Sequence, residues 1–526
     1  MQDQVYIGLA IILPLIGTIM IWMSGNRPNQ REVVTIITAG LTFLCVLQLL
    51  PEVLAGRQPE LRVTELLPGL ELAFKVEPLG MMFALIASFL WIITSFYAIG
   101  YMRGHHEPNQ TRFYMCFAIA ISSALAIAFS GNMFTLFIAY EVLTLSTYPL
   151  VTHSQTDEAR RAGRVYLGIL MSTSIGLLMI GVIWTWAAAG TLDFTEGGIL
   201  KGKIDDGLVI VLLFLYMYGI GKAALMPIHR WLPAAMVAPT PVSALLHAVA
   251  VVKAGVFTVL KVIIYIFGID FLTETGASVW LMYVAAVTII VASLVALTKD
   301  NLKARLAYST ISQLAYIVLA GALATSHSLV GGAMHIAMHA FGKITLFFCA
   351  GAIMVASHKT EVSQMRGLGW RMPFTFAAFL IGALSVIGLP PLGGSWSKWY
   401  IAMGAVDADQ LIFIAVLMIS SLLNIAYLIP VFARGFFGPR AEQEAQMAGG
   451  HAEDHGGHHD GDGHGDGDGD GDGDVEAVSA AQGSWRDRIA EAPLFCLVPL
   501  WITALGCIAL FVFADELYNM LLPIVN

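Results

Sequence analysis

The sequence has few charged residues for its length. Of its 526 residues only 12% are charged, whereas 57% are hydrophobic and the mean hydropathy is +0.74. An ordinary soluble domain has about 25% charged residues. A single enlarged core does not explain the difference, because single cores stop growing at about 250–300 residues. The composition excludes a soluble globular protein and indicates an integral membrane protein built mostly of spanning segments.

Cysteine is scarce and scattered. None of the five cysteines belongs to a C-x-x-C pair, and all lie in apolar runs: Cys45, Cys116, Cys349, Cys496 and Cys507. Iron–sulfur and structural zinc sites need clustered thiolates. The sequence therefore predicts no cofactor held by cysteine, and these side chains are expected to pack as small core residues.

Signals for nucleotides and nucleic acids are also lacking. Gly221-Lys222 and Gly342-Lys343 have no upstream glycine of a Walker A loop, since Tyr216 and Ala337 stand at that position. The net charge of −9 gives no basic excess for nucleic acid. The first apolar run, at 6–23, follows Asp3 and no basic residue, which favours a retained span over a cleaved signal peptide.

What the sequence does contain is a series of apolar runs of about 20 residues, the length that spans a bilayer. We expect an all-α membrane protein with about fourteen such helices. The expected spans are 5–24, 33–54, 78–101, 113–130, 132–152, 164–187, 208–227, 241–267, 278–297, 304–325, 328–356, 373–402, 411–436 and 493–514.

Basic residues support this map. If the N-terminus is outside, the inner segments hold 18 basic residues and the outer segments hold 5, namely Arg57, Arg62, Lys75, Lys201 and Lys203. Inner loops of membrane proteins carry such an excess of Lys and Arg. With an even number of spans, both termini are predicted to lie outside.

Five lysines remain inside predicted spans: Lys222, Lys253, Lys261, Lys343 and Lys398. A charge in mid-bilayer costs about 2.5–3.5 kcal/mol on insertion scales, so such residues usually mark ion or proton pathways. One acid, Glu141, stands alone in the fifth run. It is the natural counter-ion for a buried lysine, although a static structural ion pair would explain it as well.

Two of the lysines lie beside helix-breaking residues. Lys222 is followed by Pro227 and Pro233, and Lys398 is preceded by the four breakers Pro390, Pro391, Gly393 and Gly394. Interrupted spans at corresponding places in two halves predict inverted repeats with binding sites near mid-membrane. The alternative is a kinked helix whose lysine reaches toward the headgroups.

The other three lysines differ in expected depth. Counted from residue 241 at 1.5 Å per residue, Lys261 lies about 30 Å across, which predicts a side chain at the outer interface. The same count puts Lys253 near mid-bilayer, about 18 Å across, with His247 almost two turns before it. Lys253 is assigned to the pathway, and His247 is either part of it or an ordinary buried histidine.

The eleventh run contains HIAMHAFGK, which places His335, His339 and Lys343 on one helix face at successive spacings of four. Such a histidine pair is able to bind zinc. A zinc protease would need Glu after the first histidine, and Ile336 stands there. Since histidine titrates near neutrality, the stripe is instead suited to exchanging protons with water.

A low-complexity segment, 451–474, interrupts the last loop and consists almost entirely of His, Asp and Gly. This composition predicts a solvated, disordered spacer. Weak candidates for loose binding of a divalent metal are His451, His455, His458 and His459. We expect removal of this segment to leave transport unchanged.

Three stretches carry a resemblance to a known family. EVLTLSTYPL, KAALMPIHRWLPAAMVAPTPVSALLHAVAVVKAGVF and HIAMHAFGKITLFFCAGAI resemble the antiporter-like membrane subunits of Mrp-type Na+/H+ antiporters, respiratory complex I and membrane-bound hydrogenases. The resemblance covers about residues 75–436. It implies a fourteen-helix core with two inverted five-helix repeats and two broken helices.

The resemblance also implies a domain division and a pathway. The divisions are 1–110 (three helices), 111–270 and 271–436 (the repeats), 437–492 (the linker) and 493–526 (the last helix). The implied proton-pathway residues are Glu141, Lys222, His247, Lys253, His335, His339, Lys343 and Lys398. The chain lacks the long lateral helix of the family's largest members, and its linker has no family counterpart.

These features together predict a proton-translocating, Mrp D-like subunit in a bacterial inner membrane, with other membrane subunits, H+ and Na+ as partners and no cofactor. It would be part of a secondary transporter and not itself an enzyme. One alternative is a pumping subunit of complex I or a related hydrogenase complex. Another is a structural scaffold whose buried charges form static pairs.

Overall fold

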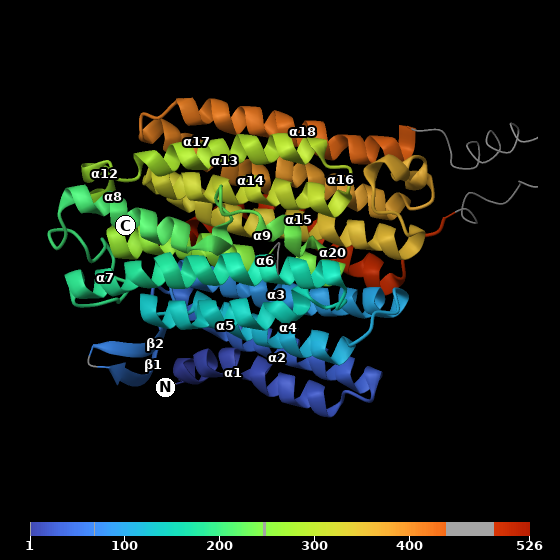
Figure 1. Cartoon of the computed structure of the whole chain (residues 1–526), viewed down its shortest axis with the longest axis horizontal. Helices are drawn as coiled ribbons and strands as arrows, with labels where there is room; N and C mark the ends of the chain where they lie inside the picture. The colour runs from blue at the N-terminus through green and yellow to red at the C-terminus, as the bar shows by residue number, and fades with distance from the viewer. Residues whose placement is uncertain (1, 68, 246–248, 438–488, 526) are drawn as a thin grey trace, which may run out of the picture.

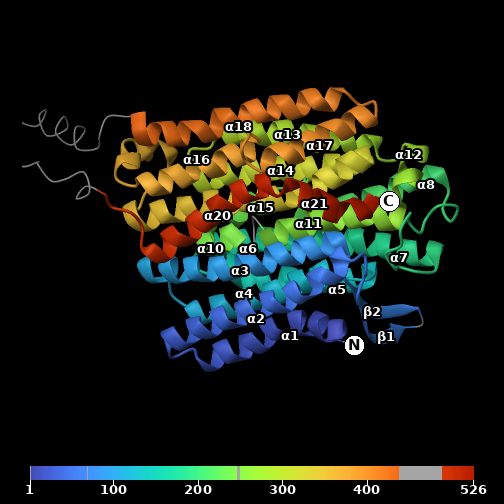
Figure 2. The ribbon, with the colours of Figure 1, turned by 180° about the vertical axis from the view of Figure 1, so that it is seen from behind.

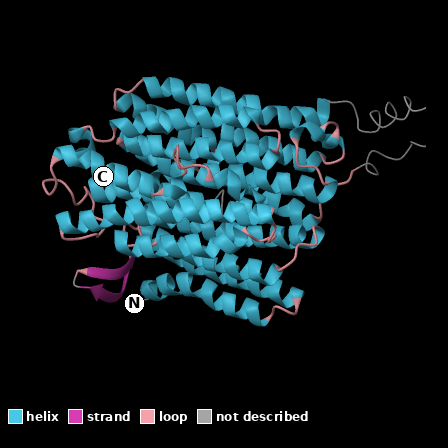
Figure 3. Ribbon diagram, in the orientation of Figure 1, coloured by secondary structure: helices cyan, strands magenta, loops and turns pink. Residues whose placement is uncertain are grey.

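The structure is a computed structural model that describes residues 2–67, 69–245, 249–437 and 489–525. Its helices run side by side along one common direction (Figure 1). Apart from one two-stranded hairpin, the regular elements in this part of the chain are helical (Figure 3). A membrane imposes this architecture, because a helix satisfies all its backbone hydrogen bonds internally where no water is available.

Among the described residues, eleven helices are long and apolar enough to span a membrane, or twelve if one bent pair counts as a span. The eleven are α1 (Gln2–Met23), α2 (Pro28–Leu54), α3 (Pro78–Gly104), α4 (Gln110–Ala128), α5 (Met133–Val151), the joined α6, η1 and α7 (Asp157–Ala189), α13 (Val279–Thr298), α14 (Leu302–Leu323), α15 (Ser326–Ser357), α18 (Ile412–Phe437) and α20 (Leu494–Val512).

The expected count of fourteen is therefore not confirmed in the described part of the chain. Of the three remaining expected spans, the structure divides 208–227 and 373–402 into shorter helices, while the described part of 241–267 includes Val251–Phe267, which bends by 79° into Ile269–Thr275. The shorter elements in and around these spans are α8 (Asp206–Gly219), η2 (Gly221–Ala223), α9 (Trp231–Ala234), η3 (Ala235–Val237), α10 (Thr240–Leu245), α11 (Val251–Lys261), η5 (Val262–Phe267), α12 (Ile269–Thr275), α16 (Pro373–Ile387) and α17 (Gly394–Asp407).

Proline and glycine cause two of these breaks. Proline has no N–H and its ring clashes with the preceding turn, and no α-helix is formed between Gly219 and Trp231, where Pro227 lies. Between α16 and α17 the chain turns at Gly388 with φ +90°. A Cβ on Gly394 would overlap the Ser385 carbonyl oxygen, so only glycine lets α17 begin so close to the end of α16.

The helices differ in burial. Of the 18 most apolar consecutive residues of α14, 94% are buried inside the protein, whereas for α1 the share is only 28%. α14 and α15 lie in the middle of the bundle, whereas α1 with α2 and α18 with α13 lie toward opposite edges (Figures 1 and 2). Exposed side chains on the edge helices are apolar, for example Trp22 and Leu422. Their surfaces therefore suit lipid or a neighbouring membrane subunit.

The hairpin marks one end of the bundle. Strands β1 (Glu60–Leu67) and β2 (Leu70–Lys75) pair antiparallel with Glu60 opposite Lys75. Both chain termini lie at this same end, which we call the hairpin end (Figure 1). At the opposite end, the described helices are joined by short loops. The last helical segments, α21 (Ala514–Leu521) and η9 (Leu522–Val525), return the chain to the hairpin end.

Candidate functional site

The first candidate site lies at the break after α8. Lys222 is completely buried in η2. Its Nζ donates hydrogen bonds to the Tyr140 carbonyl oxygen at 2.8 Å and to Thr144 Oγ1 at 2.5 Å. The same nitrogen lies 3.1 Å from the centre of the Tyr140 ring. The Tyr140 hydroxyl accepts a hydrogen bond from the Lys222 backbone N–H at 3.1 Å. One turn of α5 thus holds both ends of this lysine.

Glu141 follows Tyr140 on α5, but it does not touch Lys222. Both carboxylate oxygens are buried and make no hydrogen bond, and no described basic side chain lies within 4.0 Å of them. The expected counter-ion is therefore the sequence neighbour of a residue that binds Lys222, but it forms no direct ion pair with the lysine.

The second candidate site lies at the break between α16 and α17. Lys398 is 9% exposed. Its Nζ donates to the Ile387 carbonyl oxygen at 2.9 Å and to Ser421 Oγ at 3.2 Å. The nitrogen also lies 4.8 Å from the centre of the Tyr316 ring. A carbonyl freed by the end of α16, a hydroxyl and an aromatic face surround this lysine. Lys222 also has a carbonyl, a hydroxyl and an aromatic face, but its carbonyl belongs to Tyr140 inside the continuous helix α5.

A row of side chains joins α11 to the second site. Lys253 Nζ lies 2.5 Å from His339 Nδ1. The His339 and His335 rings stack with their centres 5.7 Å apart and their planes 2° from parallel. The His335 ring stacks in turn on Tyr316, with centres 5.6 Å apart, and Tyr316 faces Lys398. Lys253, His339, His335, Tyr316 and Lys398 therefore form a continuous row, which we call the central row.

Neighbouring polar groups fix the orientation of His335. Its Nδ1 lies 2.8 Å from Ser397 Oγ, and its Nε2 lies 3.1 Å from Gln313 Oε1. The amide oxygen can only accept, so Nε2 donates to Gln313. The Ser397 hydroxyl itself donates to the Gly394 carbonyl oxygen at 3.2 Å, so the serine is also tied to the start of α17.

Lys343 lies two turns further along α15 than His335. It is fully buried, and its Nζ donates to the Leu306 carbonyl oxygen of α14 at 3.3 Å. Lys343 is therefore beside the central row without a direct hydrogen bond to it. His247 and the linker histidines His451, His455, His458 and His459 lie outside the described residues.

The prediction that the Lys261 side chain reaches outward to the interface is wrong. The side chain is 1% exposed and lies inside the protein. Instead Nζ forms an ion pair with Glu77 at 2.7 Å, donates to the Ser130 carbonyl oxygen at 3.1 Å and lies 4.1 Å from the Phe194 ring centre. The depth estimate took no account of rotation about the helix axis, and α11 turns Lys261 inward toward α3.

No group of three or more His, Cys, Asp or Glu side chains suited to holding a metal occurs among the residues that the structure describes. The two histidines of α15 stack on each other and are held by Lys253, Gln313 and Ser397. Both ring nitrogens of His335 and Nδ1 of His339 thus lie within hydrogen-bonding distance of protein nitrogen or oxygen atoms.

Sequence reasoning missed Tyr140 and Tyr316. The signal was available, because Ala139–Leu143 reads AYEVL and Ala315–Leu319 reads AYIVL. Each tyrosine precedes the lysine that it contacts by 82 residues. Two matching motifs at matching distances indicate an internal repeat.

Comparisons with known proteins agree with this architecture. The family model described as NADH:quinone oxidoreductase/Mrp antiporter, TM, matches residues 130–424, and that of the N-terminus of NADH-ubiquinone oxidoreductase (complex I) chain 5 matches residues 69–114. These matches define an antiporter-like, multi-pass membrane subunit. The chain belongs to the NADH:quinone oxidoreductase/Mrp antiporter family.

Individual relatives come from several kinds of complex. The chain is 32% identical over 389 residues to NADH-quinone oxidoreductase subunit N of Desulforudis audaxviator, covering 71% of this chain and 75% of that protein. It is 33% identical over 347 residues to hydrogenase-4 component B of Escherichia coli, covering 63% and 50%. The chain thus spans only about half the length of the latter relative.

Solved structures show the same fold. A chain of the Mrp complex from Dietzia sp. superposes with a TM-score of 0.81 at 20% identity, covering 99% of this chain and 97% of that one. A chain of an archaeal membrane-bound sulfane sulfur reductase gives 0.80 at 22% identity, covering 99% and 98%. Both structural relatives are parts of multisubunit membrane complexes.

Proposed function

We propose that this chain is a proton-translocating, Mrp D-like subunit of a multisubunit Na+/H+ antiporter. The observation that carries the proposal is the central row, which places exchangeable nitrogen and oxygen atoms in sequence through the buried middle of a membrane protein. Intramembrane ionisable residues are costly and usually serve ion or proton transfer.

In this proposal Lys222 and Glu141 control the entrance to the row. A charged Glu141 stabilises the protonated form of Lys222, and neutralising Glu141 favours release of that proton. Close backbone packing brings Lys222 near α11, since a Cβ on Gly255 would overlap the Lys222 carbonyl carbon. Lys253 lies two residues before Gly255 and begins the row.

Lys398 is the far end of the proposed relay. Its amine binds a proton between the Ile387 carbonyl and the Tyr316 ring. His335 and His339 pass protons by exchanging donor and acceptor roles at their ring nitrogens. Lys343 adds a charge beside the row, which changes how easily the histidines are protonated.

We also propose that the hairpin end faces outward. The basic residues assigned to outer loops, such as Arg57, Arg62 and Lys201, belong to elements of this end, whereas Arg27 and Arg103 belong to the opposite end. This distribution follows the positive-inside rule. The opposite end is therefore called the inner end below.

A pumping subunit of complex I or of a hydrogenase complex is the second candidate function. It is favoured by the sequence relatives, which include a quinone oxidoreductase subunit and a hydrogenase component. The two candidates share the relay and differ in what drives it. Neighbouring genes would distinguish them: small Mrp-type subunits indicate antiport, and flavin and iron–sulfur subunits indicate redox-driven pumping.

The direct test is proton flux in vesicles that contain the purified, assembled complex. Antiport predicts a change in internal pH when a Na+ gradient is imposed, and a much smaller one with choline. Proton movement that requires a reductant and quinone, and does not respond to Na+, would instead support the second candidate. A complex that moves no protons under either condition would leave only a scaffold role.

A further inference from the structure

A cavity of about 280 Å³ opens at the inner end of the bundle, away from the central row. It lies where the ends of α3, α10, α14 and α15 meet. The side chains that line it and are able to bind protons or hydrogen bonds include Tyr101, His105, Glu107, Thr240, Lys303 and Lys359. No residue proposed above for the relay lines this cavity.

Glu107 is the acid of the cavity and links two histidines. One carboxylate oxygen lies 3.0 Å from His105 Nδ1, and the other lies 3.8 Å from His153 Nε2. The Glu107 side chain is 12% exposed, that of His105 is 31% exposed and that of His153 is fully buried. Exposure thus falls from His105 through Glu107 to His153, as a path from water into the protein requires.

His153 lies in the loop between α5 and α6, outside the spanning segments. Neither ring nitrogen makes a hydrogen bond of normal geometry with a protein side chain. Burial lowers the pKa of His153, the Glu107 carboxylate opposes that change, and Arg112 adds to it. Glu107 is therefore the side chain that favours protonation of His153, and the Pro108 backbone acts in the same direction.

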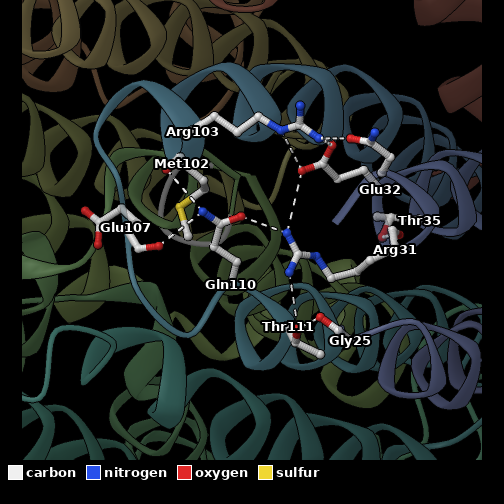
Figure 4. A network of polar contacts seen from close by, with 10 residues as sticks. Gly25, Arg31, Glu32, Thr35, Met102, Arg103, Glu107, Gln110 and Thr111 are labelled. Carbon is white, nitrogen blue, oxygen red and sulfur yellow. Dashed lines mark hydrogen bonds and ion pairs between the residues drawn. The ribbon is translucent and has the colours of Figure 1, made fainter. Parts of the chain in front are cut away.

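A polar network holds Glu107 in position (Figure 4). Gln110 Nε2 donates to the carbonyl oxygens of Glu107 at 3.1 Å and Met102 at 3.3 Å. Gln110 Oε1 accepts from Arg31 of α2 at 2.7 Å. Glu32, the next residue of α2, pairs with Arg103 at the end of α3. The loop that carries Glu107 is thereby tied to three helices.

The cavity also approaches Lys343. Lys303, which lines the cavity, donates to the Ala238 carbonyl oxygen at 2.5 Å and is influenced by the charge of Glu107. Leu306, whose carbonyl accepts from Lys343, follows one turn later on α14, an axial distance of about 4.5 Å. Along α14, the cavity-lining Lys303 is thus one turn from the residue whose carbonyl binds Lys343.

The geometry points to a proton-uptake site: we propose that the cavity lined by His105 and Glu107, with His153 buried behind Glu107, collects protons from inner-side water and passes them toward Lys343. A metal cation fits less well, because Lys303 and Lys359 contribute positive charge to the same cavity. This inference rests on the proposed proton translocation and adds the place where protons enter.

The test is the dependence of flux on inner-side pH in vesicles holding the assembled complex, with wild type compared with Glu107→Gln. The groups that face the Glu107–His153 pair are Tyr101, His105, Arg112, Lys303 and Lys359. Loss of the carboxylate removes the charge that favours protonated His153, so the pKa of His153 falls. We expect the midpoint of the pH profile to move about one unit toward acid. At pH values above the midpoint, the flux of Glu107→Gln should therefore be about tenfold lower than that of wild type.

Three further variants separate uptake from damage. Glu107→Asp keeps the charge and should restore most of the wild-type profile. Gln110→Ala loosens the loop and should shift the profile in the same direction by less. Glu158→Gln removes an exposed acid from the nearby start of α6 and should change nothing.

Two outcomes would overturn the uptake site: an unchanged pH profile for Glu107→Gln, or a flux reduced by the same factor at every pH. An unchanged profile would show that Glu107 is not part of the proton path. A uniform reduction of flux would show that Glu107 has only a structural role. Failure of the proposed function looks different, because Lys222→Ala would then keep full flux whatever Glu107 does.

Discussion

The two broken helices of this protein place a lysine in nearly the same surroundings. In the first half, Lys222 binds a backbone carbonyl and a hydroxyl and faces the Tyr140 ring. In the second half, Lys398 binds a carbonyl and a hydroxyl and faces the Tyr316 ring. The carbonyl at Lys398 is freed by the end of α16, whereas the carbonyl at Lys222 lies inside the continuous helix α5. In both halves an aromatic face adds attraction for a cation without adding charge, so dipoles and a ring hold each buried amine.

The halves differ in the residue that follows the tyrosine. It is Glu141 in the first half and Ile317 in the second. Of the two tyrosines, only Tyr140 is followed by an acid, and in the proposed function the charge of that acid favours protonation of Lys222. In both halves the carbonyl, the hydroxyl and the tyrosine ring serve to hold the lysine at a break. We infer that Glu141, present in the first half alone, allows the proton affinity of Lys222 to change.

The largest effect is expected from removing either lysine. Lys222→Ala and Lys398→Ala should each lower proton flux by at least about 100-fold, the scale typical of losing a proton-transfer group. The measurement is flux per assembled complex, with assembly checked by subunit content. A large loss for Lys222→Ala together with normal flux for Lys398→Ala would break the equivalence of the two halves.

The next effect sharpens the difference between the halves. Glu141→Gln keeps the size of the side chain but removes its charge, and flux should fall about tenfold or more. The matched control is Ile317→Val at the corresponding position of the second half, which should leave flux unchanged. Normal flux from correctly assembled Glu141→Gln protein would reduce the acid to a structural residue.

A smaller effect on flux is expected at Lys261, which lies in the first half but pairs directly with Glu77. Removing one partner of a buried ion pair typically costs about 3–5 kcal/mol. Lys261→Ala should therefore lower the thermal midpoint of the solubilised complex while flux per assembled complex stays within about twofold, since no step of the proposed relay uses Lys261.

The control for Lys261 is an exposed ion pair. Lys201 lies 2.6 Å from Glu274, and both side chains are more than half exposed. Lys201→Ala should leave stability and flux unchanged, because solvent screens such pairs. If Lys261→Ala instead stopped flux in a stable complex, the ion pair would belong to the pathway.

Much of the fold was predictable because hydrophobic run length reports directly on membrane spans. The eleven continuous spans of the described residues needed only a count of apolar residues, as for 278–297, which the structure places at Val279–Thr298. The broken spans were not countable in this way, since α8 ends at Gly219 and α16 ends at Ile387, both inside apolar sequence. The breakers were visible, but which helices they separate depends on tertiary packing.

The sequence was sufficient to predict the lysines and histidines of the candidate site, but not which contacts their side chains make. Buried lysines and the His335–His339 stripe stand out against an apolar sequence, and the structure brings Lys253 to His339. What could not be derived is which way each side chain turns. Lys261 and Lys253 are eight residues apart on α11, and only the packing of α3 against it decides that one meets Glu77 and the other a histidine.

The smallest effect concerns the two tyrosine hydroxyls. In Tyr140→Phe and Tyr316→Phe the ring that faces each lysine remains, so the attraction between ring and cation is kept. The Tyr140 hydroxyl accepts from the Lys222 N–H at 3.1 Å, whereas the Tyr316 hydroxyl donates to the Leu417 carbonyl over a longer 3.3 Å. A buried donor left unpaired costs about 1–3 kcal/mol.

Tyr140→Phe should therefore loosen the first break and lower flux about threefold to fivefold, while Tyr316→Phe should change it less than about twofold. Flux measured at several pH values in matched vesicles would detect both differences. Leu replacements at the same positions serve as references, because they remove the ring as well as the hydroxyl. A greater loss from Tyr316→Phe than from Tyr140→Phe would mean that the hydroxyl of the central row carries protons itself, and the second half would then have its own adjustable group in place of Glu141.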